Sequence, residues 1–206
     1  MKNNKKGLFI TIYGVNNLGK TTHCEILEKK LLEMGFKVKR IKYPVYSVEP
    51  SGSYINRVLR EKGFRENISG EEFQLWYVLN RYQYQDELKK LIEDGYIVIA
   101  EDYSGTGIAW GIAKGVDPEW IIKANENLLK EDLAVLFTGE RKLSSIEEVH
   151  KHEQNSELIE RCRQVHLDLS DRFNWKKMKV EDEIEDTAKN LFEIVFNYLT
   201  ENNYVS

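Results

Sequence analysis

Cysteine is scarce in this sequence of 206 residues, long apolar runs are missing, and there is no surplus of positive charge. Cys24 and Cys162 are too few and too far apart for a disulfide framework or a zinc site, so we expect two reduced thiols in a cytoplasmic protein. No stretch approaches the roughly 18 apolar residues of a membrane span. A net charge of −4 argues against a dedicated duplex-binding protein. We therefore expect neither a membrane nor a nucleic-acid partner.

Hydrophobic residues make up 41% of the chain and charged residues 31%. The length predicts a single domain over residues 1–206. Residues 141–155 are polar, lack apolar periodicity and have the size of a mobile lid.

Short apolar runs alternate with helical patterns, which is typical of βαβ units and a parallel sheet. The expected strands are residues 8–13, 38–43, 96–100, 133–137 and 177–180. The expected helices are residues 20–34, 52–93 with a break near Gly63 and Asn67, a helix that starts at Asp117 and Pro118, residues 157–173 and residues 183–199. Residues 104–107 form a glycine-rich segment between the third strand and the next helix. These patterns predict an α/β fold.

Residues 14–21 match the phosphate-loop motif G-x-x-x-x-G-K-[ST] without exception, directly after a predicted strand and at the start of a predicted helix. Such a loop turns its backbone N–H groups, here those of Asn17 to Thr22, toward a phosphate at a helix N-terminus. Lys20 would bind the β- and γ-phosphates of ATP, and the Thr21 hydroxyl would bind Mg²⁺. The predicted nucleotide-binding residues here are Gly14, Asn16, Asn17, Leu18, Gly19, Lys20, Thr21 and Thr22.

Four further segments follow the loop in order, namely Lys42 to Pro44, Leu75 to Arg81, Gly95 to Trp110 and Glu131 to Leu133. Together with the loop they resemble the thymidylate kinases, a family of P-loop nucleoside monophosphate kinases, over about residues 7–200. The resemblance implies a three-layer P-loop kinase fold whose five-stranded parallel sheet has the order 2-3-1-4-5. It also implies ATP- and Mg²⁺-dependent phosphorylation of a thymidine monophosphate-like acceptor, and a homodimer.

The same resemblance implies roles for individual residues. Tyr77 would stack on the thymine ring, Arg81 would bind the base or the phosphate, and Trp110 would border the deoxyribose. The other implied acceptor-site residues are Tyr43, Pro44 and Tyr103, and the lid cations that would reach ATP are Arg141 and Lys142.

Glu101 and Asp102 end the third strand, where ligands bind in such sheets. A carboxylate at this place can hold Mg²⁺ or orient the attacking group. We therefore predict that Lys20, Glu101 and Asp102 are catalytic and that Thr21 and Glu101 bind the metal.

The sequence departs from the family pattern at several positions. Asp102 stands where the family has a phosphate-clamping arginine, and Val45 and Tyr46 stand where it has another. Asn16 replaces an acidic residue of the loop, and Gln154 occupies a place where the lid often has arginine. The cations that could compensate are Arg57, Arg60 and Arg81.

Three alternatives follow from these departures. A deoxynucleoside kinase would use a strand-end Glu101 and the pair Phe73 and Gln74, although the Arg-Ser that normally follows the glutamate is absent. A nucleotide-binding module without turnover would explain the lost arginines but not the intact Lys20 and Thr21. A nucleic-acid-stimulated ATPase would need a basic groove, which the net charge does not support.

Overall fold

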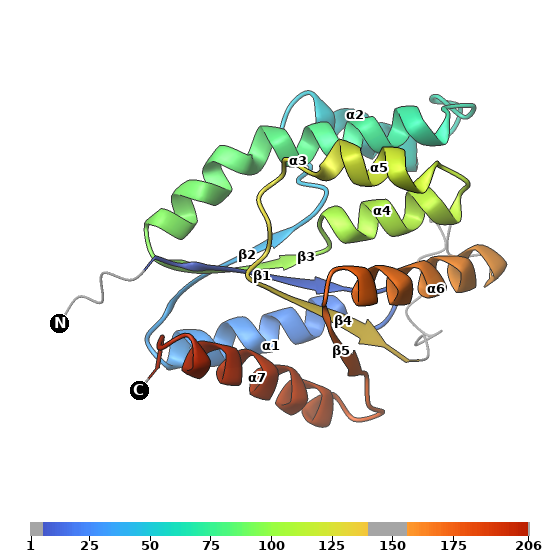
Figure 1. Cartoon of the computed structure of the whole chain (residues 1–206). Helices are drawn as coiled ribbons and strands as arrows, with labels where there is room; N and C mark the ends of the chain where they lie inside the picture. Colours follow the sequence, from blue (N-terminus) through green and yellow to red (C-terminus); the bar gives the residue numbers. More distant parts are fainter. Residues whose placement is uncertain (1–5, 140–155, 206) are drawn as a thin grey trace.

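The computed structural model describes residues 6–139 and 156–205. Its five strands form one parallel sheet with the order β2-β3-β1-β4-β5, which confirms the predicted topology (Figure 1). The strands are β1 Leu8–Tyr13, β2 Lys37–Lys42, β3 Tyr96–Glu101, β4 Leu133–Thr138 and β5 Lys176–Lys179. The helices are α1 Lys20–Glu33, α2 Ser51–Arg60, α3 Gly70–Glu93, α4 Ser104–Ala113, α5 Pro118–Asn125, α6 Ser156–Arg172 and α7 Ile184–Glu201.

Strand composition follows position in the sheet. Every residue of the central strand β1 is buried, because helices cover both faces of the sheet. The edge strand β5 buries only Met178 and exposes its three lysines. Lysines on an edge strand discourage pairing with a further strand. The apolar runs seen in the sequence are thus the inner strands, and the lysine-rich run is an edge.

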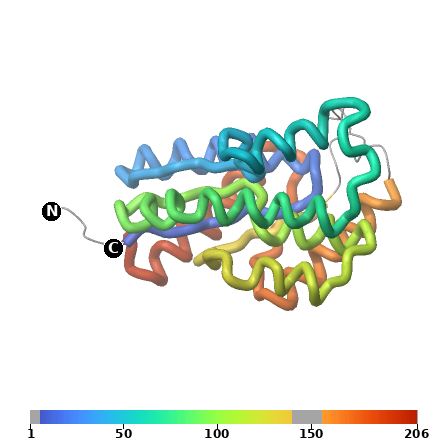
Figure 2. The backbone as a smooth tube through the Cα atoms, turned by 90° about the horizontal axis from the view of Figure 1, so that it is seen from above, coloured from blue at the N-terminus to red at the C-terminus, as the bar shows by residue number. Residues whose placement is uncertain are grey.

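The helices form two layers around this sheet. Helices α1 and α7 cover one face, and α3, α4, α5 and α6 cover the other (Figure 1). Seen from above, α3 runs along most of the length of the sheet (Figure 2). The apolar core lies between the sheet and these layers, for example at Phe9, Leu27 and Leu88, which are fully or almost fully buried.

The predicted helix boundaries are largely confirmed. Helix α3 begins after Ser69, whose hydroxyl accepts a hydrogen bond from the Glu72 backbone N–H at 3.0 Å. Asp117 caps α5 in the same way, through the Trp120 backbone N–H at 2.7 Å. The break predicted near Gly63 and Asn67 is the connection between α2 and α3.

The glycine-rich segment after β3 is the beginning of helix α4, which the sequence patterns did not predict. A Cβ on Gly105 would lie 2.4 Å from the Trp175 ring, and one on Gly111 would lie 2.3 Å from Ile121. These glycines therefore allow close packing of α4 rather than a flexible loop. Helix propensity alone disfavours glycine, so tertiary contacts decide this element.

The two cysteines are buried and free, as expected. Within residues 6–139 and 156–205, no helix combines the length and apolar character that crossing a membrane requires. The predicted lid at residues 141–155, with Arg141, Lys142 and Gln154, lies outside the described residues.

Candidate active site

A cavity of about 580 Å³ opens at the carboxyl ends of the strands. Most of the predicted site residues line it: Asn16, Asn17, Gly19, Lys20, Thr21, Thr22, Tyr43, Pro44, Tyr77, Arg81, Glu101, Asp102, Tyr103 and Trp110. Gly14 and Leu18, which also belong to the loop, line a second, smaller pocket instead, and Leu18 is almost fully buried. The parallel sheet thus brings the phosphate loop and the acceptor-side residues to one place.

The phosphate loop has the backbone that anion binding requires. Gly14, Asn17 and Gly19 all have positive φ angles, of 141°, 66° and 74°. Gly19 is the residue before α1, and no side chain caps the helix there. The first N–H groups of a helix have no partner inside the helix. Their uncapped end, with its partial positive charge, fits a phosphate group of ATP.

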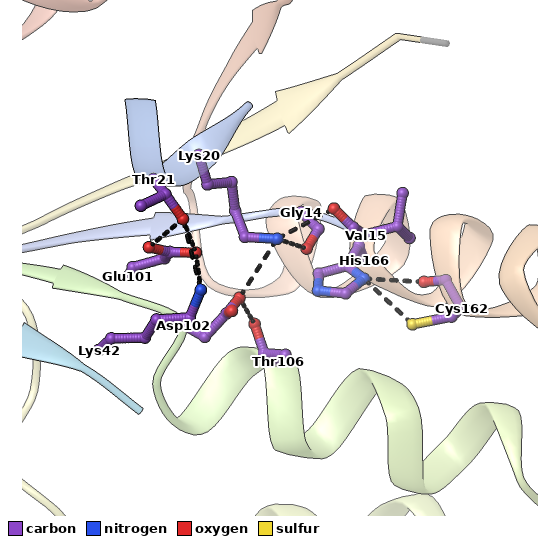
Figure 3. Close-up of polar contacts among 10 residues, drawn as sticks. All are labelled: Gly14, Val15, Lys20, Thr21, Lys42, Glu101, Asp102, Thr106, Cys162 and His166. Carbon is purple, nitrogen blue, oxygen red and sulfur yellow. Dashed lines mark hydrogen bonds and ion pairs between the residues drawn. The ribbon is translucent and has the colours of Figure 1, made fainter. Parts of the chain in front are cut away.

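Lys20 is held inside the curve of the loop (Figure 3). Its Nζ donates hydrogen bonds to the carbonyl oxygens of Gly14 at 2.8 Å and Val15 at 2.9 Å, and it lies 3.7 Å from Asp102 Oδ1. The lysine is only 5% exposed. Its ammonium group is therefore positioned before any phosphate binds. Phosphoryl transfer that is catalysed by electrostatic stabilisation of the transition state requires such a preorganised charge.

Thr21, Glu101 and Lys42 form a second polar cluster (Figure 3). The Thr21 hydroxyl lies 2.8 Å from each carboxylate oxygen of Glu101, and Lys42 Nζ lies 2.8 Å from Glu101 Oε1 and 3.3 Å from the hydroxyl. Burial lowers the pKa of Lys42, but the hydrogen bond and charge of Glu101 outweigh it and raise the pKa overall. The ammonium group therefore stays charged.

A hydroxyl and a carboxylate fit Mg²⁺, which prefers oxygen ligands and is usually held by one or two protein groups together with substrate phosphates. Among the residues that the structure describes, no three His, Cys, Asp or Glu side chains gather into a metal-binding group. The hydroxyl of Thr21 and the carboxylate of Glu101 are suited to hold an ion that a nucleotide brings with it.

Asp102 lies beside Lys20 in a strained backbone conformation, with φ at 58°. Its backbone N–H donates to the Ile12 carbonyl at 3.1 Å, and its Oδ1 accepts a hydrogen bond from Thr106 at 2.7 Å. Burial raises the pKa of its carboxyl group, while the charge of Lys20 opposes that rise. A carboxylate therefore stands close to the place where phosphates would meet.

Arg81 is a buried cation on the acceptor side. It is 4% exposed and its Nη1 donates to the Asn125 amide oxygen at 3.2 Å, while its Nε has no hydrogen-bond partner among residues 6–139 and 156–205. A Cβ on Gly107 would lie 2.4 Å from Arg81 Nη2, so only glycine allows this approach. Within the described ranges no carboxylate pairs with it, and burial lowers its pKa. A buried donor in this state favours a polar ligand in the cavity.

Aromatic side chains form the remaining wall. The rings of Tyr43 and Tyr103 pack with centroids 4.9 Å apart, and both hydroxyl groups are buried without a hydrogen-bond partner in the part of the chain that the structure describes. Tyr77 and Trp110 are half-buried and also line the cavity. Flat apolar surfaces with a few polar groups between them suit a nucleobase and a sugar.

The three cations that could compensate for the missing family arginines lie in different places. Arg60 and Arg81 line the cavity, but Arg57 does not. Arg57 instead bonds Glu61, with Nε at 2.7 Å from Oε2, and its guanidinium lies 3.8 Å from the Phe64 ring centre. The structure therefore places Arg57 outside the lining of the cavity, where a neighbouring carboxylate and ring bind it.

Several residues of the cavity were not predicted as site residues: His23, Lys42, Tyr46, Leu59, Thr106, Gly107, Lys114 and Ile184. Thr106 could have been found, since it lies only four residues after Asp102 in the sequence. Ile184 begins the last helix, and only the folding of the chain brings it to the loop.

A family model described as thymidylate kinase matches residues 12–191. A thymidylate kinase of Dictyostelium discoideum is 25% identical over 93% of this chain and 87% of its own length. A protein of Invertebrate iridescent virus 6, named "Putative thymidylate kinase 251L", is 26% identical over 96% of this chain and 92% of its own length.

The solved structure of thymidylate kinase from Candida albicans shares the fold, with a TM-score of 0.79 and 24% identity over 93% of this chain and 92% of that one. The phosphate loop and the strand-end carboxylates lie within the matched residues. By the extent of that match, this chain belongs to the thymidylate kinase family.

Proposed function

We propose that this protein transfers the γ-phosphoryl group of ATP to thymidine monophosphate, forming ADP and thymidine diphosphate. One observation carries the proposal: a single cavity holds a complete phosphate loop at one side and the buried cation Arg81 among aromatic rings at the other. Membership in the thymidylate kinase family supports the same reaction.

On the donor side, the uncapped N–H groups at the start of α1 bind the β-phosphate of ATP. Lys20 stabilises the charge that develops on the phosphoryl group during transfer. Thr21 and Glu101 would hold Mg²⁺, which neutralises phosphate oxygens when it is bound. The loop carbonyls that hold Lys20 keep its ammonium in place, so little reorganisation is needed during the reaction.

On the acceptor side, thymine stacks on Tyr77, and Arg81 donates hydrogen bonds to it from the buried end of the cavity. Tyr43, Pro44, Tyr103 and Trp110 surround the sugar and the base. An acceptor phosphate is already an anion, so its oxygen attacks without a base. Catalysis then consists of orientation and charge stabilisation by the residues already in place.

One observation favours a second acceptor class. Asp102 lies in the cavity as a carboxylate whose pKa burial raises, which suits a base that removes a proton from a nucleoside hydroxyl. Thymidine would then replace its monophosphate as the acceptor. Glu101 is less suited to this role because Thr21 and Lys42 already occupy its oxygens.

The test is ADP release by the full chain with Mg²⁺ and ATP and a panel of acceptors: thymidine monophosphate, thymidine and other pyrimidine nucleosides and monophosphates. The proposal expects the highest kcat/KM with thymidine monophosphate. Preference for thymidine would establish the nucleoside kinase instead. ATP binding without turnover on any acceptor would indicate a nucleotide-binding module.

We also propose that residues 1–206 form one P-loop kinase domain and that two copies associate. The side chains of Leu75, Leu79 and Tyr82 lie one turn apart along α3 and are 49%, 39% and 37% exposed. Such an apolar stripe on a helix is suited to a symmetric contact. Sedimentation of the wild type and of Leu79→Lys tests this: the proposal expects a dimer that the charge weakens, and a monomeric wild type would reject it.

A further inference from the structure

Five cations line the cavity: Lys20, Lys42, Arg60, Arg81 and Lys114. Three of them, Lys20, Lys42 and Arg81, already bind protein groups, and burial lowers the pKa of Lys114 to about 8, so that its charge is less permanent than that of an arginine. Lys20 is bonded to the loop carbonyls, Lys42 is paired with Glu101, and Arg81 is buried beside Asn125. Each of these side chains would have to leave an observed partner, or share it, to bind a further anion.

Arg60 is differently placed, at the last residue of α2. Its guanidinium carbon lies 4.9 Å from the centre of the Tyr46 ring, and its Nη1 donates to the neutral Asn56 side-chain oxygen at 2.6 Å. The N–H groups of a guanidinium lie along its edge and remain accessible when its face packs on an aromatic ring. From that edge they can bind a phosphate through two parallel hydrogen bonds. Tyr46 thus supports Arg60 without neutralising it.

Arg60 and Tyr46 line the cavity together with Tyr77, the expected stacking ring, and Lys42, at the end of β2. Burial raises the pKa of Tyr77, and the charges of Tyr46 and Arg60 also act on it. Tyr46 acts on the pKa of Lys42 as well, in addition to burial and Glu101.

We propose that Arg60, supported by the ring of Tyr46, binds the phosphate of the acceptor nucleotide and makes the enzyme select a monophosphate over a nucleoside. This inference rests on the proposed function. Tyr77, Arg60 and Lys20 line one cavity, so a nucleotide whose base stacks on Tyr77 and whose phosphate points toward Lys20 shares that cavity with the Arg60 guanidinium.

Calorimetry of the full chain with thymidine monophosphate and with thymidine tests the assignment. Arg60→Ala is expected to raise the Kd of the monophosphate by roughly 10- to 100-fold, the effect of losing hydrogen bonds to a charged group, and to change the Kd of thymidine less than about 2-fold. Arg60→Lys keeps the charge without the planar fork and is expected to fall between the wild type and Arg60→Ala.

Arg57→Ala is the matched control, since Arg57 lies on the same helix three residues earlier, is bound to Glu61 and does not line the cavity. It should leave both affinities unchanged. Equal weakening of both ligands by Arg60→Ala, or unchanged monophosphate binding, would overturn the assignment. Failure of the wild type to bind or phosphorylate thymidine monophosphate would instead reject the proposed function.

Discussion

Lys42 and Glu101 occupy the same register position of the neighbouring parallel strands β2 and β3, and their side chains form an ion pair with Nζ and Oε1 2.8 Å apart. Parallel register brings the carboxyl ends of both strands to one edge, so the pairing follows from the sheet itself. The ammonium group of Lys42 also contacts the Thr21 hydroxyl, which is a predicted metal ligand. Binding of Mg²⁺ and ATP must therefore compete with this lysine.

Glu101→Gln tests that arrangement. The amide keeps the size of the side chain but loses the charge that attracts both Lys42 and Mg²⁺. We expect the Mg²⁺ concentration for half-maximal rate at saturating ATP to rise by about 10-fold or more, in line with the loss of a charged metal contact. The control is Glu28→Gln, which removes from α1 a carboxylate that is paired with Arg40 of β2. An unchanged Mg²⁺ requirement would exclude Glu101 from the metal site.

Lys20→Ala removes the ammonium group from the phosphate loop. We expect kcat to fall by at least ~100-fold, because the developing charge on the phosphoryl group loses its nearest stabilising cation. Circular dichroism should show a folded protein. Lys29→Ala is the control, since its side chain is 79% exposed on α1. Retained turnover in Lys20→Ala would reject the assigned role.

Asp102→Asn distinguishes the two acceptor classes. Asparagine tolerates the positive φ and can still accept the Thr106 hydrogen bond. With a phosphate acceptor, removing a negative charge near Lys20 should lower the KM for thymidine monophosphate by about 3- to 10-fold, since one partly screened charge contact is worth about 1 kcal/mol. With a nucleoside acceptor, kcat should fall strongly, because asparagine cannot act as the general base that removes the proton from the nucleoside hydroxyl. Steady-state kinetics with both acceptors decides between these outcomes.

Gly107→Ala probes the position of Arg81. The new Cβ would lie 2.4 Å from Arg81 Nη2, so the guanidinium must move. We expect calorimetry to show about 10-fold weaker binding of both thymidine and its monophosphate, because Arg81 would contact the thymine base that both ligands carry. Alanine favours helix over glycine, so α4 itself should not suffer. If only the monophosphate binds more weakly, Arg81 contacts the phosphate instead.

We expect His166 to make the free energy of unfolding depend on pH. Its Nδ1 lies 2.9 Å from the Cys162 carbonyl oxygen, and burial lowers its pKa to about 4 (Figure 3). The unfolded chain therefore binds a proton near pH 6.5 that the folded chain does not, and stability falls as the pH drops from 6.5 toward 4. Once the pH is below the folded-state pKa, this one group has lowered the free energy of unfolding by about 3 kcal/mol in total.

Urea unfolding of the wild type and of His166→Gln between pH 7.5 and 4.5 measures this. The free energy of unfolding of the wild type should fall more steeply toward low pH than that of His166→Gln, because glutamine does not titrate. Carboxylates that titrate in the same range are present in both proteins, so only the difference between the two curves is assigned to His166. Parallel curves would show that the histidine does not set the dependence.

Much of the fold is determined locally, within the sequence. The apolar runs of β1, β3 and β4, the caps at Ser69 and Asp117, and the loop from Gly14 to Thr21 each depend on a few neighbouring residues. Patterns of this kind are visible along the chain because hydrophobic periodicity and capping act over short stretches. The lysine-rich β5 could be found for the same reason.

Other features needed the tertiary structure. Arg57 and Arg60 stand three residues apart on α2 and look equivalent in the sequence, but Glu61 binds one and the ring of Tyr46 supports the other at the cavity. Helix α4 has glycine at positions 105, 107 and 111 because Trp175, Arg81 and Ile121 leave no room for side chains. Local patterns along the chain by themselves determined the strands and the phosphate loop, whereas the sheet order was implied by the resemblance to the thymidylate kinases. The three-dimensional packing decided which cations face the substrate, because partners distant in sequence compete for each charge.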